Sequence, residues 1–260
     1  QIANMHTIFN VCTTILLLPF GTYLASFAQH ILPVENKETE DDRLLYLQPL
    51  PKSKKMIGGA AISVKQINDE TMHMLELAYE NVNQSFDQLL QFSDKTDEQI
   101  YKGEDTVNYL DKVISEYIST ALATPNLNVN ISQALSSYYL MLVDIERISD
   151  YAVNMNHQAT KRLQDQMTIS EIEIVEHMKK LCVDMKNDLN DVDEAERKDD
   201  VIDTLVSSWR EAQIQALKQQ KCSSEVSMML SRIFTDFERI NDHALNVSQE
   251  LDKITVEIPD

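Results

Sequence analysis

Two pairs of acidic residues, each inside a copy of the same eleven-residue motif, are the side chains of this sequence best suited to chemistry. The motif occurs at residues 144–154 as DIERISDYAVN and at residues 236–246 as DFERINDHALN, and seven of its eleven positions are identical. In a helix, the glutamate and the second aspartate of each copy lie one turn apart on one face. These pairs are Glu146 with Asp150 and Glu238 with Asp242. Carboxylates at this spacing repel each other, so they favour a cation between them.

A second acidic stripe precedes each motif, at the same 92-residue spacing that separates the two motifs. Its members are Glu104, Asn108 and Asp111 before the first motif, and Glu196, Asp200 and Asp203 before the second. One interpretation is that stripe and motif converge to bind cations through oxygen ligands. Two other interpretations stay open: a solvated acidic face, or a buried polar layer in which Arg147 and Arg239 neutralise the acids.

Apolar residues recur every three or four positions from residue 64 to residue 253, which predicts helix throughout this range. With only four glycines, six prolines and little strand-like alternation, the pattern predicts an all-α fold. The shared 92-residue spacing further predicts two copies of one three-helix unit. The expected helices span residues 64–92, 98–122 and 131–162 in the first copy, and 170–189, 193–218 and 223–251 in the second.

The doubled motif D-x-E-R-I-x-D-[HY]-A-x-N resembles the signature helices of the PhoU family, from about residue 60 to 253. The resemblance implies a six-helix PhoU-like domain made of two three-helix-bundle repeats, and a multinuclear iron or zinc cluster bound by carboxylates. The metal ligands that it implies are Glu104, Asn108, Asp111, Glu146, Asp150, Glu196, Asp200, Asp203, Glu238 and Asp242. Asn108 replaces an acid and Tyr151 replaces the usual histidine, so we expect the first repeat to bind metal more weakly.

The first 34 residues contain no charged side chain, and the apolar stretch at residues 8–32 is long enough to cross a bilayer. We therefore predict an N-terminal transmembrane helix, with a secretory signal cut after Ala28 as the alternative. The segment resembles the last membrane span of bacterial sodium–phosphate cotransporters, many of which carry a C-terminal PhoU-like domain. This resemblance implies a fragment of such a symporter, with a phosphate-transport membrane domain upstream of residue 1 and sodium and phosphate as that domain's substrates.

The expected domain order is a transmembrane helix at residues 1–34, a charged linker at 35–60, and PhoU-like repeats at 61–163 and 164–260. Basic residues cluster in the linker, at Lys37, Arg43, Lys52, Lys54 and Lys55. By the positive-inside rule they predict that this end of the span faces the cytoplasm. The predicted localisation is therefore the cell membrane, with the PhoU-like domain cytoplasmic.

The charge balance of 23 basic to 42 acidic residues gives a net charge of −19 and argues against nucleic acid as a partner. Three scattered cysteines offer no zinc site, and no nucleophile elbow, phosphate-binding loop or H-E-x-x-H motif occurs. We therefore expect a non-enzymatic regulatory domain that controls phosphate uptake or phosphate signalling, with a signalling protein as a further partner. The alternatives are a metal-dependent phosphohydrolase and a purely structural helical adaptor.

Overall fold

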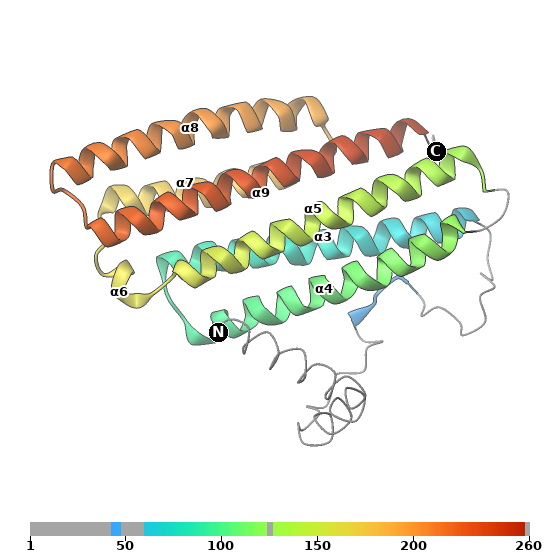
Figure 1. Cartoon of the computed structure of the whole chain (residues 1–260), viewed down its shortest axis with the longest axis horizontal. Helices are drawn as coiled ribbons and strands as arrows, with labels where there is room; N and C mark the ends of the chain where they lie inside the picture. Colours follow the sequence, from blue (N-terminus) through green and yellow to red (C-terminus); the bar gives the residue numbers. More distant parts are fainter. Residues whose placement is uncertain (1–42, 48–59, 124–126, 258–260) are drawn as a thin grey trace, which may run out of the picture. The chain divides into compact units, whose positions relative to one another are not determined.

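The structure is a computed structural model that describes residues 43–47, 60–123 and 127–257. The chain divides after Asp42, and the second unit, Arg43–Asp260, contains every residue that the structure describes. These residues form helices and connecting loops without a strand, as the sequence predicts. The helices are α3 (Ala60–Leu90), α4 (Asp94–Leu122), α5 (Val129–Gln158), α6 (Lys161–Gln164), α7 (Ile169–Asn187), α8 (Val192–Lys218) and α9 (Ser224–Glu257) (Figure 1).

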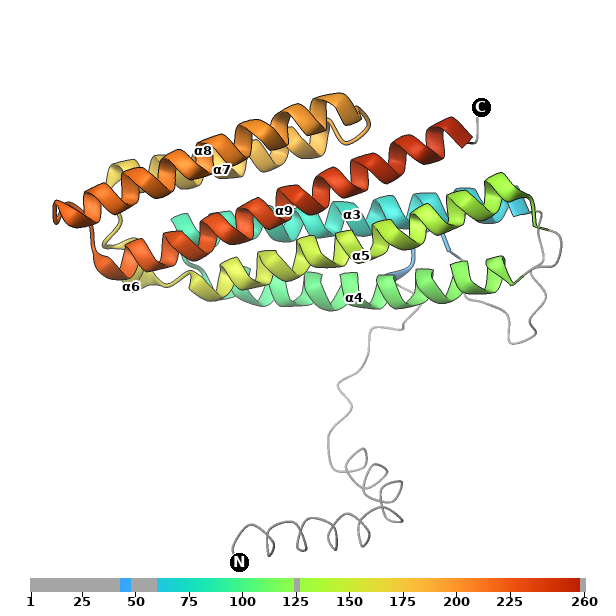
Figure 2. The same cartoon turned by 45° about the horizontal axis from the view of Figure 1, so that its top comes forward.

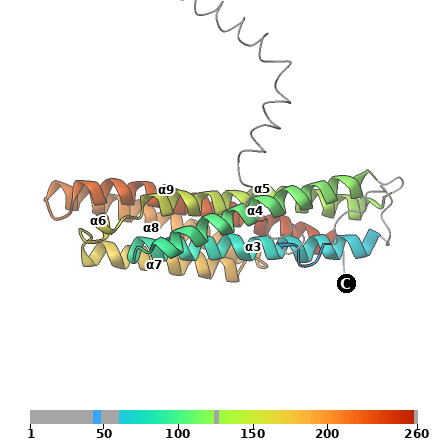
Figure 3. The ribbon, with the colours of Figure 1, turned by 90° about the horizontal axis from the view of Figure 1, so that it is seen from below.

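The long helices fall into two groups of three with the same order, α3–α4–α5 and α7–α8–α9. Helices α5 and α9, which carry the two motifs, lie side by side and form the main contact between the two groups (Figure 2). The first helices of the two groups, α3 and α7, form a layer along one side of this central pair (Figure 3). The all-α architecture of two three-helix repeats, expected from the sequence, is therefore confirmed.

The core follows from the spacing of apolar residues along α5 and α9. On α9 the fully buried positions Ile233, Phe237, Ile240, Ala244 and Val247 recur at intervals of three or four residues, which places them on one face. The ring of Phe237 meets that of Phe86 on α3 edge-on, with centroids 6.4 Å apart. Side chains from both repeats therefore share one continuous core.

Local capping residues explain where several helices begin. Ser93 caps α4 by accepting a hydrogen bond from the Thr96 amide, so the helix starts four residues before the expected Glu98. Thr168 and Glu171 form a reciprocal capping box at the start of α7. By contrast, α5 ends at Gln158 rather than at residue 162, because Ala159 adopts an extended conformation before the short helix α6.

A close contact fixes the position of α4 against α3. A Cβ atom at Gly103 would overlap the side-chain oxygen of Asn81. Asn81 is almost fully buried, and its amide nitrogen donates to the Ser149 hydroxyl at 2.9 Å. Since Asn81 is held from the far side by α5, glycine is the residue that allows α4 to approach this closely.

The predicted localisation in the cell membrane is contradicted. None of the helices in the described part of the chain combines the length and the apolar composition that a membrane span needs. Helix α9 shows why, since charged residues such as Arg232, Glu238 and Lys253 occur along its length beside the apolar face. The segment 8–32, on which the transmembrane prediction rested, lies outside the described residues.

Candidate functional site

The acidic residues of the first repeat come together across α4 and α5. Partial burial raises the pKa of Glu146, and the negative charge of Asp150 one turn away raises it further. Arg147 opposes this increase through its positive charge. Asp111 and Glu104, both on α4, also raise the pKa of Glu146, so their carboxylates act on it from the neighbouring helix. Four of the predicted ligands therefore form one electrostatic cluster.

The side chains around this cluster restrict how it binds a cation. Arg147 contacts both acids of its own motif, with its Nη1 3.1 Å from Asp150 and its Nε 3.6 Å from Glu146. Burial raises the pKa of Asp111 as well. The side-chain nitrogen of Asn108 donates to Glu104, so only the carbonyl oxygen of Asn108 remains as a metal ligand.

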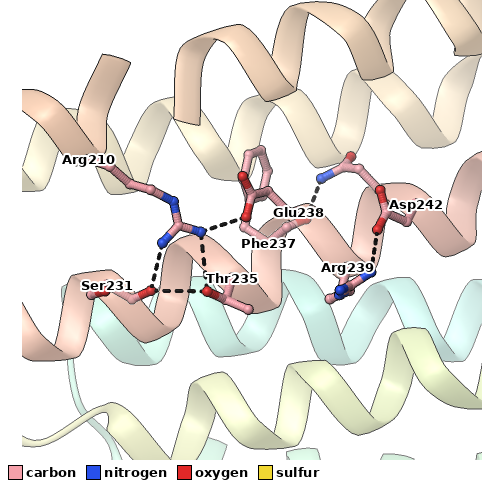
Figure 4. Close-up of polar contacts among 8 residues, drawn as sticks. Arg210, Ser231, Thr235, Phe237, Glu238, Arg239 and Asp242 are labelled. Atoms are coloured by element: carbon pink, nitrogen blue, oxygen red, sulfur yellow. Dashed lines mark hydrogen bonds and ion pairs between the residues drawn. The ribbon is translucent and has the colours of Figure 1, made fainter. Parts of the chain in front are cut away.

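In the second repeat, a positive side chain already neutralises one predicted ligand. The guanidinium of Arg210 on α8 lies 2.5 Å from the carboxylate of Glu238 on α9 (Figure 4). The same guanidinium donates to the hydroxyl of Thr235 at 3.2 Å. The repeat spacing places Ile118, which is fully buried, at the position of Arg210 in the first repeat. The two sites therefore differ in charge although their motifs match.

The remaining acids of the second repeat are arranged differently from those of the first. Glu196, Asp200 and Asp203 are exposed, and Glu196 accepts a hydrogen bond from Gln249 at 3.3 Å. On α9, Asp242 lies 3.1 Å from Arg239 within its own motif. The structure thus brings Asp203 and Asp242 into one negative region, whereas Glu196 and Glu238 bind other side chains.

Asp199 is the central acid of this region, and the sequence analysis missed it. Burial raises its pKa to about 6, with further increases from the charges of Asp203, Asp242 and Asp200. At the equivalent position the first repeat has Val107, so a comparison of the two repeats could not reveal Asp199. The sequence did offer one signal for Asp199: it lies three residues before Ile202, and residues at this spacing share a helix face. Because Ile202 is buried, Asp199 is drawn toward the core.

Three further motif positions join the repeats to each other. Nδ1 of His243 lies 2.7 Å from the carboxylate of Asp144, and the Asn246 amide donates to the same oxygen at 3.0 Å. The Tyr151 ring stacks on the His243 ring with centroids 5.8 Å apart. The first aspartate, the histidine or tyrosine, and the final asparagine of the motif therefore bind across the α5–α9 interface.

The donor set fits iron or zinc in type and in charge, since carboxylate oxygens bind both metals. The mutual repulsion that raises the pKa of Glu146 is what a cation would relieve. Within the described ranges, however, no three histidine, cysteine, aspartate or glutamate side chains converge on a common point as metal ligands do. The acids are gathered by helix packing, and binding would require their side chains to turn toward one another.

Comparison with known proteins decides the family. The model of the PhoU domain matches this chain twice, at residues 71–159 and 169–251. The chain belongs to the PhoU family. Each match covers one three-helix repeat and includes one copy of the motif.

A relative in Thermotoga maritima, the phosphate-specific transport system accessory protein PhoU homolog 1, is 24% identical over 200 residues. The alignment covers 71% of this chain and 84% of the relative. Two crystal structures have the same fold: PhoU from Pseudomonas aeruginosa (TM-score 0.69, 17% identity) and the phosphate transport system regulatory protein PhoU from Streptococcus pneumoniae (TM-score 0.66, 19% identity). They cover 77% and 75% of this chain, and 100% and 96% of their own chains are matched.

The Pseudomonas structure is matched over its whole length, so the shared fold makes up its entire chain.

Proposed function

We propose that this PhoU-family chain regulates phosphate transport and does not catalyse a reaction of its own. The observation that carries the proposal is the match of the PhoU domain to both repeats. The Thermotoga relative is named as an accessory protein of a phosphate transport system, and the Streptococcus structure as a regulatory one. Both names place those proteins with a phosphate transport system and one calls its protein regulatory, which supports regulation over the phosphohydrolase and adaptor alternatives.

The transporter that we propose as partner is a sodium-dependent phosphate cotransporter. Support comes from the resemblance of residues 1–34 to the last segment of such symporters, in which a PhoU-like domain often follows. A phosphate-signalling protein is the second proposed partner. The acidic net charge of −19 would favour partner surfaces rich in lysine and arginine.

We further propose that the acidic clusters bind iron or zinc, the first cluster more tightly than the second. The sequence alone suggested the opposite order, because Asn108 lacks a charge. One contact supports the reversal: Arg210 from the neighbouring helix already neutralises Glu238, whereas the first repeat has Ile118 at the position of Arg210. A bound metal would supply positive charge between α4 and α5 and would thereby hold these helices together.

Phosphate uptake tests the proposal directly. Cells lacking this chain, and the same cells with the full chain restored, would be compared for uptake of labelled phosphate at low and high external phosphate. We expect uptake at high phosphate to differ between the two, with sulfate uptake as the control that stays unchanged. Equal phosphate uptake at every concentration would contradict regulation.

Removing sodium from the same assay separates the proposed partner from other phosphate transporters. If the partner is a sodium-dependent cotransporter, the uptake that responds to this chain should disappear without sodium. Regulated uptake that persists without sodium would keep the regulatory function and exclude this partner.

A further inference from the structure

Residues 43–47 lie against the first repeat as a short irregular segment, which we call the strap (Figure 1). It precedes the matched PhoU domain, which begins at residue 71, so the family match does not account for it. The Arg43 guanidinium lies 4.0 Å from the centre of the Tyr109 ring on α4. Leu47, at the other end, is 4% exposed and belongs to the core.

A buried carboxylate holds the middle of the strap. Glu70 on α3 is fully buried, and it accepts hydrogen bonds from three consecutive backbone amides. The Tyr46 and Leu47 amides lie 2.7 and 2.8 Å from Glu70 Oε2, and the Leu45 amide lies 3.2 Å from the same atom. Consecutive amides that point at one anion form a nest, a geometry that recognises negative charge through the backbone alone.

The second oxygen of Glu70 has its own partner, which explains why a charge is tolerated in the core. His73 Nδ1 lies 2.9 Å from Glu70 Oε1, one turn further along α3. The Tyr46 and His73 rings pack against each other in a T-shaped arrangement, with centroids 6.3 Å apart. A buried carboxylate is costly unless its oxygens are occupied, so the strap and α3 depend on each other.

The attachment relies on hydrogen bonds more than on buried apolar area. The side chains of Leu45 and Tyr46 remain 60% and 48% exposed, and Leu47 is the strap residue that enters the core. Hydrogen bonds to a charged acceptor are stronger than neutral ones, and most of their contribution is lost when the charge is removed. Loss of the Glu70 charge should therefore weaken the docking of the strap, to which Arg43, Leu44 and Leu47 also contribute.

We propose that residues 43–47 are a releasable strap, and that the Glu70 carboxylate is the receptor that holds it on the first repeat. The strap starts at the boundary after Asp42 where the chain divides into its two units. It is thus the covalent route by which a force or a binding event on residues 1–42 reaches helix α3. This inference does not depend on the proposed regulation of phosphate transport.

Hydrogen–deuterium exchange on the full chain, read by mass spectrometry, tests the strap. In the wild-type protein, the Tyr46 and Leu47 amides should exchange more slowly than amides in an unstructured peptide. In Glu70→Gln, they should exchange faster by about tenfold or more, because a neutral acceptor replaces a charged one. Trypsin should also cut after Arg43 faster in this variant, since Arg43 would leave Tyr109. Wild-type amides that exchange at the peptide rate would overturn the proposal.

Two further variants separate release of the strap from general loss of structure. Glu80→Gln is the matched control, because Glu80 lies on the same helix and contacts Gln84 at 3.1 Å rather than the strap. It should leave strap exchange unchanged. Leu45→Pro removes one donor of the nest while leaving Glu70 intact. If Glu70→Gln fails to fold, unchanged exchange of the Tyr46 and Leu47 amides in Leu45→Pro would overturn the proposal.

Discussion

Nδ1 of His243 lies 2.7 Å from Oδ1 of Asp144, and this contact joins the second copy of the motif to the first. The motif therefore contains two sets of positions, and each set makes contacts in a different direction. Glu146 and Asp150, with their counterparts, face the neighbouring helix of their own repeat. Asp144 and Asn246 instead bind across the interface between the repeats. The length of the motif therefore reflects two functions combined on one helix.

We expect Asp144→Asn to lower the free energy of unfolding by about 1–3 kcal/mol, because it weakens hydrogen bonds from both His243 and Asn246. Urea unfolding followed by circular dichroism would measure the change. Asp236→Asn is the matched control at the equivalent motif position. Burial raises the pKa of Asp236 to about 6, so a neutral side chain there should be neutral or stabilising at pH 7. An equal loss of stability in both variants would contradict the prediction that Asp144, and not Asp236, stabilises the fold through its charge.

We expect the double change Glu146→Gln and Asp150→Asn to remove more bound iron or zinc than the double change Glu238→Gln and Asp242→Asn. The reason is that Arg210 already offsets the charge of Glu238, so this carboxylate attracts a cation less strongly than Glu146 does. Elemental analysis of full-length protein purified without chelator would give the metal content. Protein that carries no metal before any substitution would contradict metal binding at both clusters.

Replacing Arg210 by isoleucine, the residue at the equivalent position of the first repeat, should increase the affinity of the second cluster for metal. The change frees the carboxylate of Glu238 while copying the side chain of Ile118. Titration of metal-free protein with zinc would measure the effect. Arg197→Ala provides the control, since the exposed Arg197 pairs with Glu194 in the first turn of α8. If zinc affinity rises equally in both variants, the loss of one positive charge explains the increase, and the specific role of Arg210 is contradicted.

The stability lost in Glu70→Gln should depend on pH. Burial of Glu70 by itself raises its pKa, but the hydrogen bonds from His73 and the strap amides together hold the pKa below the ordinary value of 4.5. A carboxylate with a depressed pKa stabilises the fold above its unfolded pKa, and this contribution disappears as the pH falls through the folded pKa. The melting temperatures of wild type and variant should therefore differ most near pH 7 and converge as the pH falls through the lowered pKa of folded Glu70. A difference that grows on acidification would contradict this sign.

The arrangement of the helices was predictable because it depends on repetition and apolar spacing. From Ile233 to Val247 the apolar residues recur every three or four positions, and this spacing predicted the face of α9 that is buried in the structure. The earlier start of α4 was also visible, as Ser93 followed by Asp94 and Asp97 is a common capping pattern.

The chemistry of the acidic clusters was less predictable, because it depends on contacts between residues far apart in the chain. Arg210 reaches Glu238 from another helix, 28 positions away, and no local pattern assigns this pairing. Glu70 was missed for the same reason, since its donors lie 23 to 25 positions earlier. Asp199 lies outside the repeated pattern altogether, because its counterpart is apolar.

The contact between Gly103 and Asn81 has a consequence for how the first acidic cluster forms when α4 packs on α3 during folding. A helix that docks through similar apolar residues can settle one turn out of place, but here a shift by one turn would bring Gln99 or Val107 against Asn81. Both side chains are too large for that gap. Gly103 therefore allows α4 to pack on α3 in one register only. Because Glu104 is the next residue, the same register also sets the position of Glu104 relative to Glu146.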